Sequence, residues 1–235
     1  MTFAFDGSAL VFEGSRIAAS MRTFSQMRPV LAHPEKECGI DPDEPAYYMY
    51  RAAAKFKSLR YDITRITPLD LCGERCKTYG HAHPKSQKGA SWPEIYEVLA
   101  GSAHFLLQRV NELGVDDAVL LSAKKGECLL IPPGYGHVTI NEGKTELVLA
   151  NIVSDRFEAD YSTYTNHRGA CFYENTKGEI VRNKNYGIDF ELRKDTAVKF
   201  SSAFAAFAPF RKGNILAAAK NWENISFLDK PEEFY

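Results

Sequence analysis

The sequence lacks the features that would direct a chain to a membrane, to nucleic acid or to the secretory pathway. It has no apolar run near the roughly 20 residues that a membrane helix needs. No positively charged segment followed by an apolar core opens it. Its 29 basic and 30 acidic residues leave a formal net charge of -1, so there is no basic excess to attract nucleic acid. We therefore expect a cytoplasmic protein with neither membrane nor nucleic acid as a partner.

Cysteine is scarce as well. The five cysteines are an odd number and come without a secretory signal, so we expect free thiols and no disulfide framework. Cys72 and Cys76 are separated by three residues, which would suit half of a zinc site, but no second cysteine pair follows them. We therefore predict that both are free thiols.

Short apolar runs separated by turn residues make up most of the chain. Between residues 61 and 67, apolar and polar side chains alternate as they do in a half-buried strand. Further runs and turns follow at intervals of roughly ten residues, which predicts an all-β sandwich or barrel. The runs lie at 104–110, 118–122 and 145–153, and a last hairpin is expected around 175–178. The 235 residues, 45% of them hydrophobic, suit one domain with extended ends.

The first chemically informative stretch is GHAHPKSQKGASWPEIYEVLAG, residues 80–101. Residues two apart on a strand project to the same side, so His81 and His83 can present two imidazoles to one ion. Glu94 opens an aromatic and β-branched run that is typical of a strand. If that strand pairs with the histidine segment across the polar loop between them, Glu94 returns beside the two histidines.

The second stretch, GECLLIPPGYGHVTIN at 126–141, adds His137. Its Pro-Pro-Gly at 132–134 marks a turn, and we expect the apolar runs on either side to be antiparallel strands. Three neutral imidazoles and one carboxylate suit Fe(II), Mn(II), Ni(II) or Zn(II), with positions left for oxygen ligands. The alternative is that these are ordinary strand histidines satisfied by hydrogen bonds, which requires two separate motifs to coincide by accident.

The spacing of the two stretches resembles the two cupin motifs. The second stretch matches at every fixed position, whereas ten residues separate His83 from Glu94 where the family has three or four. Cupins are double-stranded β-helices, or jelly-roll barrels, so the resemblance implies the same all-β class as the alternation of strands and turns. We expect an N-terminal arm at 1–45 that packs on the barrel, a cupin barrel at 46–190 and a C-terminal extension at 191–235.

Within the cupins, three segments resemble the metal-dependent glucose-6-phosphate isomerases: TYGHAH at 78–83, PEIYEVLAG at 93–101 and IPPGYGHVTIN at 131–141. The resemblance implies one divalent ion per chain, with Fe2+ ahead of Mn2+, Ni2+ or Zn2+. It also implies a homodimer that interconverts glucose 6-phosphate and fructose 6-phosphate in glycolysis and gluconeogenesis. The implied metal ligands are His81, His83, Glu94 and His137, and Glu94 as base and Tyr96 as a positioned hydroxyl are the implied catalytic groups.

The family's phosphate pocket falls on Tyr47, Thr64, Thr78 and Gly80 in this sequence. Hydroxyl and backbone N–H groups donate hydrogen bonds to phosphate oxygens without carrying charge, and glycine permits close approach of the backbone. Without the resemblance, Thr64 and Thr78 would be read as ordinary strand threonines.

The chain departs from the family after the last barrel strand. Family members carry Tyr-Pro-Ala-Asp and then Gly-His-Asp-Tyr, of which only Asp155, Asp160 and Tyr161 have counterparts here. Proton transfer by the missing histidine would fall to Glu158 or Glu94, or would not occur. Two other functions therefore stay open, an Fe(II) cupin dioxygenase and a non-catalytic cupin that binds a sugar phosphate.

Overall fold

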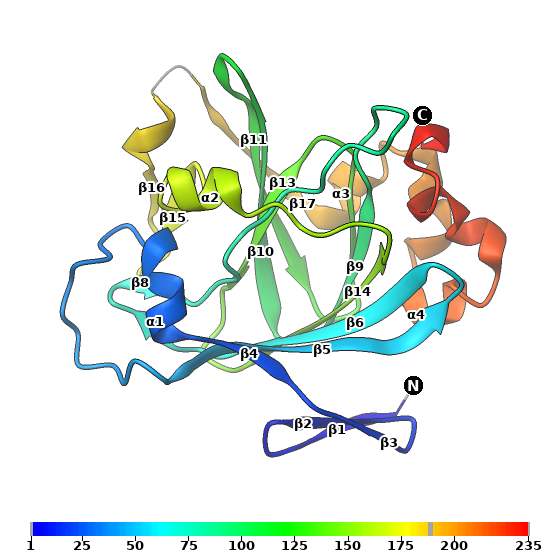
Figure 1. Ribbon diagram of the computed structural model, residues 1–235, viewed down its shortest axis with the longest axis horizontal. Helices are drawn as coiled ribbons and strands as arrows, with labels where there is room; N and C mark the ends of the chain where they lie inside the picture. Colours follow the sequence, from blue (N-terminus) through cyan, green and yellow to red (C-terminus); the bar gives the residue numbers. More distant parts are fainter. Residues whose placement is uncertain (1, 188–189, 235) are drawn as a thin grey trace.

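The computed structural model describes residues 2–187 and 190–234, and two β-sheets dominate it (Figure 1). The larger sheet has the strand order β12 (Cys128–Ile131), β9 (Glu94–Ala100), β14 (Leu147–Ser154), β6 (Leu59–Ile66), β5 (Pro45–Phe56) and β4 (Ser20–Thr23). The smaller sheet has the order β13 (Gly136–Asn141), β10 (Ser102–Asn111), β11 (Gly114–Lys124) and β17 (Leu192–Thr196).

Three small sheets lie outside these two. They are formed by β1 (Phe3–Asp6), β2 (Ala9–Phe12) and β3 (Ser15–Ile17), by β7 (Asp70–Leu71) and β8 (Glu74–Arg75), and by β15 (Phe172–Glu174) and β16 (Ile180–Arg182). The last pair is the hairpin that the sequence predicts around residues 175–178, and that prediction is confirmed.

All helices are short. The α-helices are α1 (Phe24–Met27), α2 (Ser162–Asn166), α3 (Ala197–Ser201) and α4 (Ile215–Ala218). The 3-10 helices are η1 (Arg28–Val30), η2 (Lys184–Tyr186), η3 (Ala205–Phe210), η4 (Trp222–Asn224), η5 (Ser226–Leu228) and η6 (Pro231–Glu233). In the described ranges, none of them has the length and apolar character that crossing a bilayer requires.

The interior between the two large sheets is filled by alternate residues of their strands. Val98 and Leu149 of the larger sheet share one apolar cluster with Phe105 and Leu121 of the smaller sheet. Side chains two apart on a strand point to the same side, so a regular period of two is enough to build this core. The all-β expectation is confirmed, and the barrel is a cupin double-stranded β-helix.

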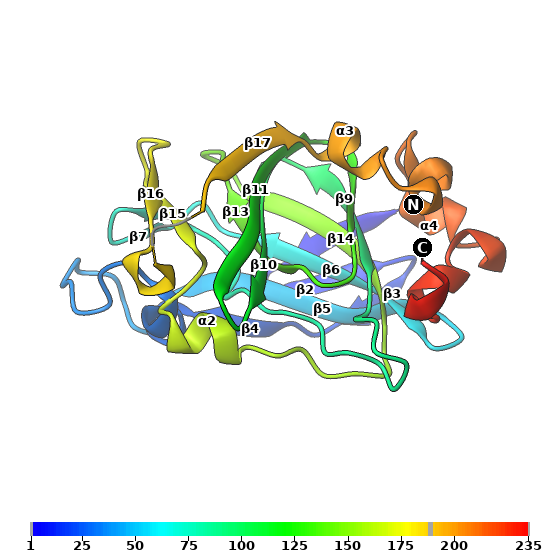
Figure 2. The ribbon, with the colours of Figure 1, turned by 90° about the horizontal axis from the view of Figure 1, so that it is seen from above.

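The outer side of the larger sheet is covered too. Its alternate residues Ile63, Ile95 and Ile152 pack in a second apolar cluster with Phe207 and Phe210 of the C-terminal segment. Figure 2 shows the C-terminal helices beside β9 and β14. Burial on both faces explains why β14 is apolar over almost its whole length, since every residue of it is buried.

The predicted arm and extension each contribute a strand to the barrel sheets. Strand β4 pairs antiparallel with β5, and β17 pairs parallel with β11. The β1–β3 sheet packs against the larger sheet. Phe5 contacts Tyr50 of β5 and Phe12 contacts Tyr61 of β6, with ring centroids 5.6 and 5.7 Å apart. The division of the chain into arm, barrel and extension stays a prediction.

One expectation about strand pairing is wrong. The apolar runs before and after the turn at 132–134 do not pair with each other, because β12 pairs with β9 whereas β13 pairs with β10. The turn carries the chain from one sheet to the other. Its sequence is compatible with either connection, and the packing of the barrel decides between them.

The expectation for Cys72 is also wrong. Cys38 and Cys72 form a disulfide, with their Cα atoms 5.5 Å apart, whereas Cys76, Cys128 and Cys171 are free and buried as expected. The loop before β5 folds back over the β7–β8 hairpin, where Lys36 Nζ donates to the Cys72 carbonyl at 2.9 Å. A contact between residues 34 apart depends on that loop packing, which neither cysteine spacing nor number reveals.

A candidate metal centre and its cavity

The three histidines and the glutamate of the two motifs converge in the structure. One ligand atom from each of His81, His83, Glu94 and His137 lies within 4.8 Å of the other three. His83, Glu94 and His137 are buried, and His81 is partly exposed to the cavity described below. The group that the sequence predicts is therefore assembled from segments distant along the chain.

The strand pairing that brings them together differs in part from the prediction. Glu94 begins β9 and His137 lies on β13, and each of these strands pairs with others. His81 pairs directly with His137, since the backbone N–H of each donates to the carbonyl of the other at 3.2 and 2.9 Å. The predicted hairpin between the histidine segment and the Glu94 strand is confined to the loop, where Lys85 bridges Ser91.

Hydrogen bonds outside the group orient its members. His83 Nδ1 lies 2.7 Å from the Trp92 carbonyl, and donation to that oxygen leaves the Nε2 lone pair directed at the group. Asn151 Nδ2 donates to Glu94 Oε1 at 2.6 Å. Tyr96 Oη lies 3.0 Å from His137 Nε2.

Glu94 Oε2 is the atom that most clearly indicates a cation. It is buried and has no hydrogen-bond partner among the described residues, although Nε2 of both His83 and His137 lies 3.4 Å from it. A buried carboxylate oxygen without a donor is costly unless a cation balances it. Together with the imidazole nitrogens it makes a donor set suited to a divalent metal ion.

Burial also fixes the protonation states that metal binding requires. It lowers the pKa of His137 to about 4 and the pKa of His81 well below its ordinary value, so both imidazoles are neutral near pH 7. Burial opposes ionisation of Glu94, but the nearby His83, His137 and Arg60 together outweigh it and the pKa of Glu94 is lowered. Burial followed by the charge of Glu94 raises the pKa of Tyr96 well above its ordinary value, so Tyr96 keeps its proton.

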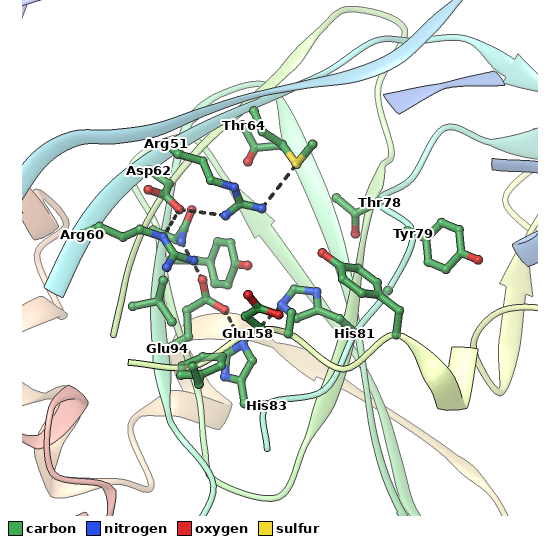
Figure 3. Close-up of a pocket in the computed structure, with 18 of the residues that line it drawn as sticks. Arg51, Arg60, Asp62, Thr64, Thr78, Tyr79, His81, His83, Glu94 and Glu158 are labelled. Carbon is green, nitrogen blue, oxygen red and sulfur yellow. Dashed lines mark hydrogen bonds and ion pairs between the residues drawn. The ribbon is translucent and has the colours of Figure 1, made fainter. Parts of the chain in front are cut away.

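A cavity of about 480 Å³ opens beside this group (Figure 3). His81, His83 and Glu94 line it, and Tyr96 lies alongside, while His137 completes the group from behind. The four residues predicted to contact phosphate line the same cavity: Tyr47, Thr64, Thr78 and Gly80. The residues of the two motifs and the residues predicted to contact phosphate therefore meet in one space.

The residues predicted to contact phosphate are held by the chain around them. Thr78 Oγ1 accepts from the Thr139 N–H at 3.0 Å, and Tyr47 Oη accepts from the Tyr79 N–H at 3.4 Å. Gly80 has φ +88°, and a β carbon there would lie 2.6 Å from Val138 Cγ2. Only glycine fits this position.

Several charged or polar lining residues escape the sequence prediction. They are Arg51, Arg60, Asp62 and Asn151. The alternation along β6 places Arg60 and Asp62 on the same side as Thr64, which is a signal that the sequence contains. Arg51 likewise follows Tyr47 and Met49 at a spacing of two along β5, and all three line the cavity, although pairing between β5 and β6 is irregular from Tyr50 to Ala54.

The segment that departs from the family pattern also borders the cavity. Glu158, Phe157 and Tyr161 line it, with the Phe157 ring 4.6 Å from that of His83. Glu158 is therefore near enough to the site to take part, as the sequence comparison allows. His167, the next histidine along the chain, is not near enough to take part, because it stacks on Tyr186 with ring centroids 4.2 Å apart and lies outside the lining.

Comparison with known proteins gives one family. The model of the glucose-6-phosphate isomerase (GPI) family matches residues 21–191. The glucose-6-phosphate isomerase of Pyrococcus furiosus is 27% identical over 157 residues, which cover 65% of this chain and 78% of that protein. The enzyme of the same name from Thermococcus litoralis is 24% identical over 170 residues, covering 71% of this chain and 85% of that protein.

Solved structures are more distant. An oxalate oxidase is 16% identical with a TM-score of 0.36, and the match covers 58% of this chain and 55% of that one. An oxalate decarboxylase of Lactobacillus farciminis is 19% identical with a TM-score of 0.37, covering 49% of this chain and 30% of that one. The chain thus spans about half of the first structure and less of the second, and at this similarity neither indicates an activity.

Proposed function

The chain belongs to the glucose-6-phosphate isomerase family, and on that basis we propose that it interconverts glucose 6-phosphate and fructose 6-phosphate with the help of one divalent metal ion. The observation that carries the proposal is the shared cavity. A group suited to a metal ion and a set of uncharged hydrogen-bond donors line the same 480 Å³ space. A sugar phosphate needs both features, one for the reacting carbons and one for the phosphate.

The metal would be held by His81, His83, Glu94 and His137. Fe2+ is the ion we propose first, followed by Mn2+, Ni2+ and Zn2+, since all accept neutral imidazole together with one carboxylate. When bound, the ion would act as a Lewis acid that polarises the carbonyl group of the sugar. Burial keeps His81 and His137 neutral and so ready to bind it at physiological pH.

The phosphate would lie against Tyr47, Thr64, Thr78 and the Gly80 N–H. Hydroxyl groups and a backbone amide can donate to phosphate oxygens from several directions. Gly80 immediately precedes His81, so the phosphate contact and the first metal ligand belong to the same short segment. A sugar chain anchored at this end would then extend along the cavity toward the metal group.

The reaction moves one hydrogen between C2 and C1 and leaves the oxidation state of the whole molecule unchanged. On one route, a base takes the C2 proton, a cis-enediol forms and the proton returns to C1. On the other, hydride passes directly from one carbon to the other. Glu94 is the proposed base, and Glu158 is the second carboxylate within the lining that could take this role.

Tyr96 contributes as a neutral phenol. Its raised pKa keeps the proton on Oη, which can therefore donate a hydrogen bond to a substrate oxygen beside the metal group. Strand geometry supports this role, because Glu94 and Tyr96 lie two apart on β9 and project to the same side. The proposal further includes a cytoplasmic location, together with a homodimer, which the family resemblance implies.

A coupled assay with fructose 6-phosphate tests this function and its two alternatives. The purified protein is assayed directly, after EDTA, and after addition of each of the four metals, with and without oxygen. Loss on chelation and recovery without oxygen supports the isomerase. Oxygen uptake that accompanies turnover would instead identify a dioxygenase, and binding without turnover a non-catalytic sugar-phosphate protein.

A matched pair of variants tests whether the activity depends on the face of β9 that lines the cavity. Glu94→Gln should abolish turnover and lower the bound metal. Glu97→Gln is the control, since Glu97 lies on the opposite face of β9 and accepts from the Ile215 N–H at 2.8 Å. Equal activity of the two variants would contradict the proposed site.

A further inference from the structure

Two arginines share one buried carboxylate in the wall of the cavity. Asp62, whose side chain is 5% exposed, accepts from Arg60 Nε at 2.8 Å and from Arg51 Nη1 at 3.2 Å through the same Oδ2. Among the described lining residues, Arg51 and Arg60 are the only arginines or lysines. Asp62 can balance only one of these two guanidinium groups, and the other carboxylates of the lining belong to Glu94 and Glu158.

Arg51 continues the alternation of Tyr47 and Met49 along β5, all three of which line the cavity, and an irregularity in β5 follows it. Pairing with β6 is broken between Tyr50 and Ala54, and Ala52 takes a left-handed conformation with φ +54° that a residue with a side chain rarely adopts. The Ala52 N–H donates to the other oxygen of Asp62 at 2.7 Å, which holds the bulge in place. Bulges and strained backbone conformations are frequent next to active sites.

Strand register places this cluster level with the metal group. Asp62 lies opposite Asn151 of β14, and Asn151 in turn lies opposite Tyr96 of β9. Asn151 also donates to Glu94, a predicted metal ligand. Thr64, a predicted phosphate contact, lies one row further along the sheet, two residues from Asp62. The arginines are therefore closer to the reacting end of the cavity than the row of Thr64 is.

Arg51 retains hydrogen-bonding capacity. Its side chain is 49% exposed, and within the described residues the partner of Nη2 is Met49 Sδ at 3.7 Å, a weak acceptor. In Figure 3 its guanidinium extends from the strand into the lining, between Thr64 and Glu94. A structural arginine that served only Asp62 would not need this orientation.

We propose that Arg51, oriented by Asp62, is a further catalytic residue that donates to the substrate oxygen on C1 or C2 where negative charge develops. The inference rests on the proposed isomerase function. Either route places negative charge on these oxygens, one as an enediolate and the other as an alkoxide. A guanidinium fixed beside a developing anion stabilises the transition state more than the bound substrate, so its loss acts on kcat more than on KM.

The kinetic test compares Arg51→Met and Arg51→Lys with Arg65→Met. Arg65 is the matched control, because it lies on the opposite face of β6 and pairs with Glu146. We expect kcat to fall at least tenfold in Arg51→Met with KM changed less than threefold, a smaller loss in Arg51→Lys, and no loss in Arg65→Met. In Arg51→Ala, added guanidinium at millimolar concentration should restore part of kcat.

Asp62→Asn tests the orienting role. The amide keeps an oxygen for the Ala52 N–H but loses the charge that holds the two arginines. We expect kcat to fall in this variant, and the double variant with Arg51→Met to fall no further than Arg51→Met alone. Additive losses would overturn the claim that Asp62 acts through Arg51.

Binding measurements separate this inference from the isomerase proposal. Gluconate 6-phosphate carries a carboxylate where charge develops in the reaction, and glucitol 6-phosphate has a neutral alcohol there. In calorimetry on the metal-loaded protein, Arg51→Met should weaken the first at least tenfold and the second less than threefold. If the wild type is inactive but Arg51→Met still weakens the first ligand more than the second, the isomerase function is refuted and the charge-binding role of Arg51 is kept.

Three results would overturn the inference. A raised KM with unchanged kcat, or equal loss of affinity for both ligands, would make Arg51 a phosphate contact. Unchanged kinetics and unchanged affinities would make it a structural residue. Thermal unfolding of every variant is measured in parallel, so that a change in folding is not mistaken for a change in chemistry.

Discussion

Gly80 is the position where a single added methyl group should reveal how the site is supported. Its φ of +88° is unfavourable for any residue with a side chain. A β carbon would also lie 2.6 Å from Tyr164 Cε1 and 2.6 Å from Val138 Cγ2. The Tyr164 ring, on α2, packs against Gly136 as well, and these two glycines immediately precede His81 and His137.

Two costs combine in Gly80→Ala. The left-handed conformation costs about 1 to 2 kcal/mol for a residue with a β carbon. Forcing a methyl group into a packed interior costs about 1 to 3 kcal/mol more. The free energy of unfolding should therefore fall by about 2 to 5 kcal/mol, and metal binding should weaken because His81 is the next residue.

Gly89→Ala carries the first cost alone, so the difference between the two variants isolates the second. Gly89 has a similar φ of +89°, but a β carbon there would meet nothing within 4 Å. Urea unfolding of both variants in EDTA, with metal content measured separately, compares them without the stabilising effect of bound metal. If Gly80→Ala lowers the free energy of unfolding no more than Gly89→Ala does, the inferred packing of Tyr164 and Val138 against Gly80 is refuted.

Three further predictions concern the surroundings of the metal group and the disulfide. Asn151→Leu removes the donor to Glu94 Oε1 and should weaken metal binding by about 10- to 100-fold; competition with a chelator measures this, and unchanged affinity would contradict the orienting role. In EDTA-treated protein, the pKa of His137 is about 4 in the folded state and about 6.5 in the unfolded state. The neutral imidazole therefore contributes about 3 kcal/mol to the free energy of unfolding above pH 6.5, and this contribution is lost as the pH falls toward 4. Urea unfolding across this range, with His137→Gln as the control, should show a steeper loss in the wild type. Reducing Cys38–Cys72, which closes a loop with a sequence separation of 34, should lower the free energy of unfolding by about 3 to 4 kcal/mol; equal urea midpoints with and without dithiothreitol would show that the bond does not stabilise the protein.

The part of the site that lies on regular strands could be predicted from the sequence. Alternation assigns β6 correctly and the aromatic, β-branched run assigns β9, where Glu94 and Tyr96 lie on one face because they are two residues apart. The convergence of the histidines could be predicted because each of the two motifs supplies only part of one set of metal ligands. Local pattern and donor chemistry were enough for these residues.

Two features that escaped prediction depend on departures from regular structure. Ala52, next to Arg51, takes a left-handed conformation at the bulge in β5 and has no composition signal for it. The bond between Cys38 and Cys72 depends on how a long loop packs. Local periodicity carries no information about either, since both are set by contacts between distant segments.

The C-terminal segment packs against the same strand, β9, that carries Glu94 of the metal group. On β9, Glu94 and Tyr96 project into the cavity, whereas Ile95 packs under the C-terminal segment and Glu97 accepts from the Ile215 N–H. Because successive residues of a strand lie on opposite faces, any shift of β9 that loosens one face displaces the other. The segment that matches nothing in the isomerase motifs therefore helps to fix the position of the carboxylate on which the proposed chemistry depends.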